Sequence, residues 1–265
     1  MSLLALHLAI AREFGGSVNA ESRGSRAENP HQIEVITRLH ARSCQLTDEI
    51  LSLLAAGFAD GAMARWRALH EVAVVALLVS RHDDLLAERY LAHAEVESWR
   101  AITEYSEFSE RLGYPPVSAE EFAEVRDRYD RVIARFGSDF GLQYGWAAEI
   151  VDSRRPRFAD IERAVGTDHL RPHYRMASHA IHANPKGVLF KLGLLEGVEG
   201  LLAGPSDVGL ADPGHSTAIS LAQASSCLLT LSPSFDHIVL VGAMHLLQDE
   251  IGSAFLGVHQ AMGGT

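Results

Sequence analysis

Lysine and cysteine are both scarce in this sequence of 265 residues. Lys186 and Lys191 are the only lysines, so Arg supplies the other 21 of the 23 basic residues. The two cysteines, Cys44 and Cys227, stand far apart, each in an apolar stretch with helical patterning. We therefore expect two buried free thiols and no disulfide, which fits a protein of the reducing cytoplasm.

Long apolar runs and an overall basic charge are also missing. No stretch of about 18 uninterrupted apolar residues occurs, so we expect no membrane span and no membrane partner. The first apolar segment, Ser2–Phe14, lacks a basic start and a small-residue cleavage site, so we do not expect a signal peptide. The formal net charge of −11 excludes nucleic-acid binding through a uniformly basic surface, although a local basic groove remains compatible with it.

Helical periodicity dominates the remaining pattern. Apolar residues recur at steps of three and four through Ile33–Phe58, and Ala62–Leu78 ends in a solid apolar run. The pattern further predicts one long helix from Asp83 to about Leu112, one over Asp168–His182, and a last one over Phe235–Gln260. These features predict an all-α protein.

The predicted organisation is a single-domain multi-helix bundle. Residues 1–30 are expected to form an N-terminal helix and loop, and residues 31–265 the bundle core. The segment 187–211 is the least helical part, because it is rich in Gly and Pro, and we expect a short irregular or hairpin insertion there. No linker or low-complexity segment divides the chain into two domains.

The stretch from Tyr174 to His182 carries the polar residues best able to support chemistry. On a helix, residues at offsets of zero, three, four and seven share one face. These residues are Arg175, Ser178, His179 and His182, with Tyr174 on the stripe of Ser178. Such a stripe is either a catalytic site or a set of buried hydrogen-bonding groups that locks helix packing, and the sequence leaves both open.

The catalytic alternative is metal-independent cleavage of a phosphodiester. A histidine can move the proton near neutral pH while an arginine stabilises the charge of the phosphorane. We therefore predict that Arg175 binds the scissile phosphate and that His182 is the general acid or base. His179 and Ser178 would assist. Six Arg against three acids in 154–175 form a positive island that is consistent with a phosphate-bearing ligand.

A second polar cluster surrounds the start of the apolar run Val72–Val79. Its members are predicted supporting residues: Arg65, Arg67, His70 and Glu71, then Arg89, Tyr90 and His93 on the next helix. Arg67 and Glu71 are four residues apart and can pair along one helix. The default expectation is a structural pair that fixes helix register. The functional alternative is that Glu71 orients His182 or Arg175 across the bundle.

The 14 histidines make a metal site worth considering. Zinc or iron ligands could come from His70, Glu71, His93, His179 and His182. The spacing matches no metalloprotease motif, because Val74 and not His follows Glu71 by three residues. Walker A, dinucleotide-binding and nucleophile-elbow motifs are also absent, so we expect no metal and no cofactor.

Several short motifs together resemble a bacterial family known as domain of unknown function 5677. They are Arg65-x-Arg67-x-x-x-Glu71, Arg89-Tyr90 with His93, Tyr144-Gly-Trp-Ala, and Tyr174-x-x-x-Ser178-x-x-x-His182-Ala-Asn184-Pro. The similarity spans about Ile33 to Leu231. It implies a helical protein and marks these residues, Asn184 included, as a candidate site, but it implies no activity.

A looser resemblance is to the HEPN superfamily of helical toxins and defence ribonucleases. Their motif is an Arg followed after four to six residues by a His, and it acts across a dimer interface. Arg175 and His182 fit with six intervening residues, and Arg65 and His70 fit with four. This resemblance implies a homodimer that cuts RNA in a toxin or phage-defence system. The alternatives are a non-catalytic helical binding or scaffold protein and a metal-dependent hydrolase.

Overall fold

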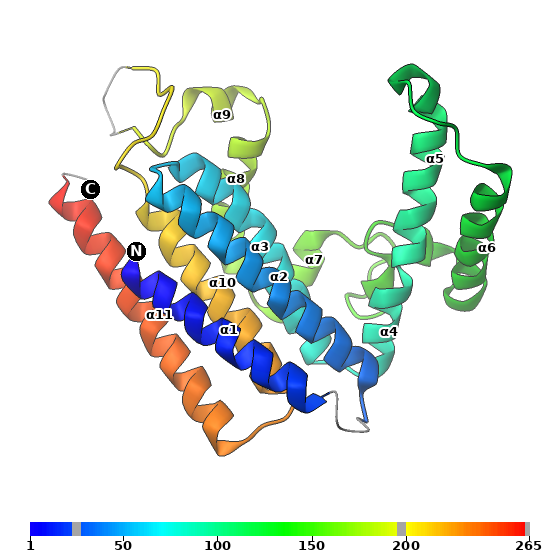
Figure 1. Ribbon diagram of the computed structural model, residues 1–265, viewed down its shortest axis with the longest axis horizontal. Helices are drawn as coiled ribbons and strands as arrows, with labels where there is room; N and C mark the ends of the chain where they lie inside the picture. The colour runs from blue at the N-terminus through cyan, green and yellow to red at the C-terminus, as the bar shows by residue number, and fades with distance from the viewer. Residues whose placement is uncertain (23–27, 195–199, 263–265) are drawn as a thin grey trace.

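A computed structural model describes residues 1–22, 28–194 and 200–262 (Figure 1). Every regular element within these ranges is helical, which confirms the all-α prediction. The bundle consists of α1 (Ser2–Ser22), α2 (Pro30–Ala55), α3 (Ala59–Ser80), α10 (Ala211–Leu229) and α11 (Phe235–Ala261). Helices α2, α3 and α10 pack on one another, and α1 and α11 cover α10.

Helix α3 forms the centre of the bundle, as its apolar sequence predicts. Trp66, Leu69 and Leu78 have no exposed surface. The indole nitrogen of Trp66 donates to the Ser216 carbonyl of α10 at 2.9 Å, so this large side chain is buried without an unmet donor. Both free cysteines are buried, as expected.

The region after α3 contains α4 (Asp84–Ala92), α5 (Ala94–Leu112) and α6 (Ala119–Phe136). The single long helix predicted for this region is wrong, because the chain divides at His93 into α4 and α5. The His93 ring is held there by the Leu142 carbonyl, at 2.8 Å from Nε2. Helices α5 and α6 pack on each other and lie at the end of the molecule opposite the two termini (Figure 1).

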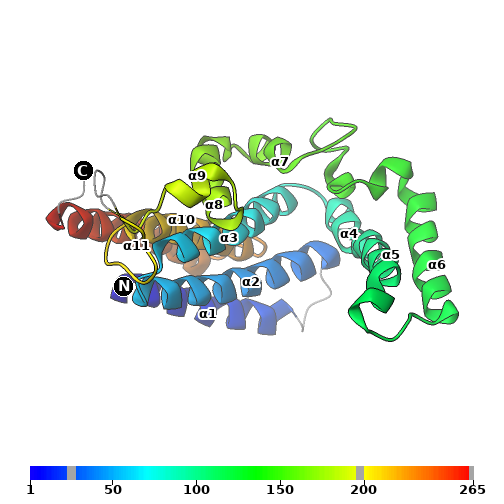
Figure 2. The same cartoon turned by 90° about the horizontal axis from the view of Figure 1, so that it is seen from above.

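The chain then crosses α3 with short elements: η1 (Ser138–Gly141), η2 (Gly145–Ala147), α7 (Phe158–Val165), η3 (Asp168–Leu170), α8 (Arg171–Ile181) and α9 (Pro185–Leu189). Helices α7 and α8 pack against α3, and α9 packs against α8 (Figure 2). The hairpin alternative for the segment 187–211 is not present in its described parts, 187–194 and 200–211. These parts hold the end of α9, the start of α10 and, over 190–194 and 200–210, chain without helix or strand.

Helix α11 is long and apolar enough to cross a membrane by length and composition alone, with a mean hydropathy of 1.2 over its most apolar window. The expectation of no span rested on uninterrupted apolar runs, and Asp249 and Glu250 interrupt this one. In this structure α11 instead packs against α10 and α1, and much of its surface is exposed.

Candidate functional site

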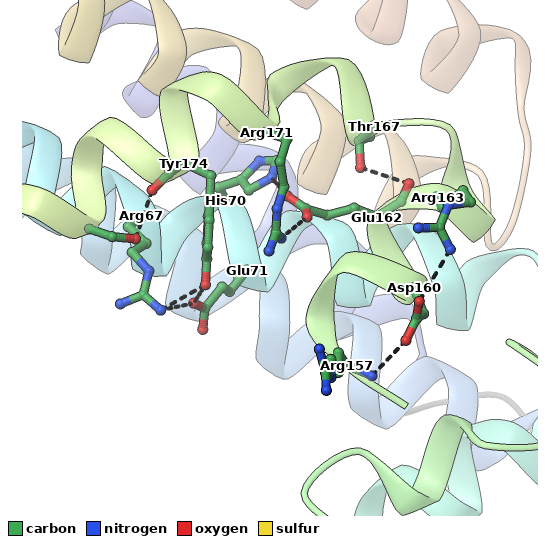
Figure 3. A network of polar contacts seen from close by, with 11 residues as sticks. Arg67, His70, Glu71, Arg157, Asp160, Glu162, Arg163, Thr167, Arg171 and Tyr174 are labelled. Atoms are coloured by element: carbon green, nitrogen blue, oxygen red, sulfur yellow. Dashed lines mark hydrogen bonds and ion pairs between the residues drawn. The ribbon is translucent and has the colours of Figure 1, made fainter. Parts of the chain in front are cut away.

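Tyr174 joins α8 to α3. Its hydroxyl accepts a hydrogen bond from Arg67 Nη2 at 2.7 Å and donates one to Glu71 Oε1 at 2.5 Å (Figure 3). The predicted pair of Arg67 and Glu71 is present, with 3.3 Å between Nη2 and Oε1. The structure thus brings together three residues that the family motif had marked, and Glu71 contacts Tyr174 instead of orienting His182 or Arg175.

The Tyr174 ring lies between two guanidinium groups. Arg67 is 4.7 Å and Arg171 5.2 Å from the ring centroid. Burial raises the pKa of Tyr174 strongly, and the hydrogen bond to Glu71 raises it further. The phenol therefore keeps its proton at physiological pH and acts as the donor that this bridge requires.

A second set of contacts ties α7 to α3 beside this bridge. His70 and Glu162 have no exposed side-chain surface, and their Nε2 and Oε1 atoms are 3.1 Å apart. Arg171 donates to the other carboxylate oxygen of Glu162 (Figure 3). Thr167 donates its hydroxyl to the Glu162 carbonyl at 3.3 Å. Since a buried carboxylate is costly without partners, these contacts hold α3, α7 and α8 in one register.

A cleft of about 850 Å3 opens on the side of α8 that carries Arg175. Its walls come from η3, α8 and the region of α9: Asp168, His169, Arg171, Pro172, Arg175, Met176, His179, Lys186 and Phe190. The lining thus contains two guanidinium groups, one ammonium group and two imidazoles, but only one carboxylate, that of Asp168. In a chain of net charge −11, this is a local concentration of positive charge.

Much of this positive charge is not neutralised by the described residues. Arg171 is paired with Glu162, whereas Arg175 and Lys186 make no ion pair with any described side chain. Arg175 and Lys186 are exposed to solvent. The cleft is therefore suited to an anion with several oxygens, such as phosphate, which guanidinium groups bind in a bidentate manner.

Asn184 fixes the orientation and the tautomer of the His179 ring. Asn184 Oδ1 accepts from the Gly187 backbone N–H at 2.8 Å, so this amide oxygen is an acceptor. The same oxygen lies 3.2 Å from His179 Nδ1, which must then carry the proton of a neutral ring. His179 Nε2 is left as the basic nitrogen of a histidine that lines the cleft.

His182 and Ser178 are placed differently from the predicted stripe. Helix α8 ends at Ile181, and His182 adopts an extended conformation with φ −103° and ψ 141°. The observed end of the helix is thus one residue before the predicted end, and the exposed side chain of His182 does not line the cleft. Ser178 donates to the Tyr174 carbonyl at 2.9 Å within its own helix, as serines in helices commonly do.

The predicted supporting residues of α4 form a separate structural cluster. Arg89 donates to the carbonyls of Trp146 and Gly145, at 3.1 and 3.3 Å, and to Glu149 Oε1 at 2.9 Å. The Tyr90 ring packs edge-on against Trp146 with 5.0 Å between centroids. These contacts anchor the Tyr144-Gly-Trp-Ala motif to α4, so the two motifs marked by the resemblance fold against each other.

Two other predicted residues lie outside both the Tyr174 bridge and the cleft. Arg65 forms an ion pair with Glu49 of α2, and His93 contacts the Leu142 carbonyl. The candidate metal ligands do not converge, because no group of three His, Cys, Asp or Glu side chains suited to a metal occurs within the described ranges.

The residues of the site that sequence reasoning missed include Glu162, His169, Arg171, Lys186 and Phe190. A signal existed for two of them. Arg171, Arg175 and His179 follow one another at four-residue steps, and Lys186 is one of only two lysines. Glu162 and His169 precede α8, and Phe190 follows the turn at Asn184. No spacing rule connects residues outside the helix with the face of α8.

The family comparison covers the part of the chain that forms this site. A model of a family of unknown function, DUF5677, matches residues 33–197, which is more than half of the chain. This range contains both the Tyr174 bridge and the residues that line the cleft. No curated protein and no solved structure matches the chain. The chain belongs to the family of unknown function DUF5677.

Proposed function

We propose that this chain binds RNA through its phosphate groups in the cleft beside α8 and cleaves it without a metal. The observation that carries the proposal is the position of Arg175 and Lys186, which present positive charge to the same cleft as His179. Phosphate contacts supply most of the affinity of nucleic-acid-binding proteins. In an acidic chain, a cationic cleft would favour the binding of RNA in that cleft.

The roles follow from the chemistry of each group. Arg175 and Lys186 hold the scissile phosphate and stabilise the charge of the phosphorane. His179 Nε2 takes the proton from the ribose 2′-hydroxyl, whose oxygen attacks phosphorus. The bond from phosphorus to the 5′-oxygen breaks, and His169 or water returns a proton to that oxygen. The products are a 2′,3′-cyclic phosphate and a 5′-hydroxyl.

This assignment moves the proton-transferring role from His182 to His179. Arg175 and His179 have three intervening residues, which is shorter than the HEPN spacing of four to six. The proposal therefore rests on the cleft, and a HEPN-like role in a bacterial toxin or phage-defence system remains a prediction.

Burial raises the pKa of Cys44 to about 11, which keeps this thiol protonated and unreactive, in keeping with a cytoplasmic protein.

A non-catalytic binding module is the second candidate. It is favoured by the fully buried pair of His70 and Glu162, which serves to hold the helices together and faces no open space. In that case the cleft would bind a phosphate-bearing ligand without cleaving it, and His179 would act only as a donor to the ligand.

The test is cleavage of a fluorescent single-stranded RNA by protein dialysed against EDTA. We expect His179→Ala to lower the rate by about 100-fold or more, the usual contribution of a general acid or base. Arg131→Ala, which changes an exposed Arg of α6, is the matched control for loss of surface charge. Binding without cleavage by wild-type protein would support the binding module instead. Loss of activity in His182→Ala but not in His179→Ala would contradict the assignment.

A further inference from the structure

The outward face of α11 carries a row of exposed apolar side chains and has no partner in the described part of the chain. These side chains are Phe235, Ile238, Val239, Leu246 and Leu256. Phe235 is 80% exposed and Leu246 is 71% exposed. Scattered exposed apolar residues are ordinary, but a row of them along one helix marks an interaction surface.

The exposed positions of α11 repeat at the spacing that is typical of a helix packed against another helix. Exposed residues follow one another at steps of four or three at positions 235, 239, 242, 246, 249, 253 and 257. Such a repeat keeps one stripe facing a partner along the whole helix. Gly242 and Gly257 of this stripe have nothing near the place of a Cβ, so a partner backbone can approach closely there.

We infer that this face pairs with the same face of a second copy of the chain, in antiparallel orientation about Leu246. The stripe is self-complementary in that orientation. Its first half carries the bulky Phe235 and Val239, and its second half carries the small Ser253 and Gly257. A two-fold axis near Leu246 places the bulky half of each copy against the small half of the other.

The charges of α11 favour the antiparallel pair over a membrane. Asp249 lies on the stripe and Glu250 beside it, and α11 contains no Lys or Arg. A parallel pair would place these carboxylates beside their own copies, whereas the antiparallel pair places them opposite the uncharged Gly242 and Ala243 of the other copy. An anionic membrane surface attracts helices with basic polar faces, and α11 has the opposite charge.

The area of the face is sufficient for a dimer. A helix of the length of α11 extends about 40 Å. Its five exposed large apolar side chains would each bury on the order of 100 Å2. Over both copies this amounts to about 1,000 Å2, the lower end of what specific interfaces bury.

This interface does not involve the cleft. Helix α11 packs on α10 and α1, whereas α8 packs on α3 (Figure 2). Each copy of such a dimer therefore keeps a complete cleft of its own. The dimer and the proposed RNA chemistry can consequently be tested independently of each other.

The primary test is the mass in solution, measured by sedimentation velocity between about 1 and 100 μM. Wild-type protein is expected at twice the chain mass of 28.8 kDa. Leu246→Glu should raise the dissociation constant at least tenfold, because it buries a charge at the two-fold axis. The matched control is Leu112→Glu at the end of α5, which is 58% exposed and lies outside this face. This control should remain a dimer.

The orientation is tested by oxidative cross-linking, which the buried native thiols do not obscure. Leu246→Cys should form a disulfide across the axis, whereas Phe235→Cys should not, because an antiparallel pair separates the two copies of residue 235. Cross-linking of both variants would contradict the antiparallel pair. A wild-type monomer at 100 μM would overturn the inference, as would a monomer that floats with phosphatidylcholine vesicles through α11.

Discussion

Glu162→Ala is expected to lower the free energy of unfolding by about 3–5 kcal/mol. Glu162 is fully buried and is the common partner of His70 and Arg171. Its removal leaves a buried imidazole and a partly buried guanidinium without the carboxylate that compensates their loss of water. Urea unfolding followed by circular dichroism at pH 7 measures the effect.

The matched control is Glu34→Ala, which removes a carboxylate from an exposed pair with Arg38 on α2. A pair of this kind is worth less than about 0.5 kcal/mol. Equal losses in the two variants would show that the buried contact contributes no more than a surface pair. The contacts of Glu162 would then not be what holds α8 in its position.

Stability is also expected to fall steeply as the pH drops from 6.5 toward 4. Burial lowers the pKa of His7 to about 4, with a further contribution from the nearby His245, and burial lowers that of His40 to about 4. The unfolded chain takes up these protons near pH 6.5, whereas the folded protein does so only near pH 4. The stabilising effect is complete above pH 6.5 and is lost as the pH falls.

The expected size is about 2 kcal/mol for each of the two histidines by pH 5. His40→Gln should therefore remove about half of the loss between pH 7.5 and pH 5. His40 contacts Ser225 Oγ at 3.2 Å, a hydrogen bond that Gln can replace. The control is His237→Gln at the exposed start of α11. An identical pH dependence in wild type and His40→Gln would contradict this assignment of the loss.

The helices could be predicted from the sequence because their apolar periodicity reflects burial. The capping serines also mark helix starts locally: Ser118 and Ser234 accept from backbone N–H groups three residues on. The end of α8 was predicted to within one residue, because Asn184 and Pro185 give a local stop signal and start α9. The break at His93 could not be predicted, because it depends on a carbonyl 49 residues away.

The site was predictable only in part. The shared order of motifs identified Tyr174, Arg67 and Glu71, and the structure brings them into contact. The cleft depends on the return of the chain after Asn184, which carries Lys186 to the face of α8. A pattern of spacing on one helix contains no information about that return. His182 was therefore selected by spacing, although His179 lines the cleft and His182 does not.

The most direct test of the cationic cleft is the affinity for a fluorescent 12-nucleotide single-stranded RNA, measured by anisotropy at low salt. The cleft variant is Arg175→Glu with Lys186→Glu, and the control is Arg126→Glu with Arg131→Glu on α6, which changes the net charge equally. We predict that the cleft variant weakens binding by at least about 100-fold, while the control stays within about threefold of wild type. Equal affinities for all three proteins, or no binding by wild type, would contradict the proposed RNA site.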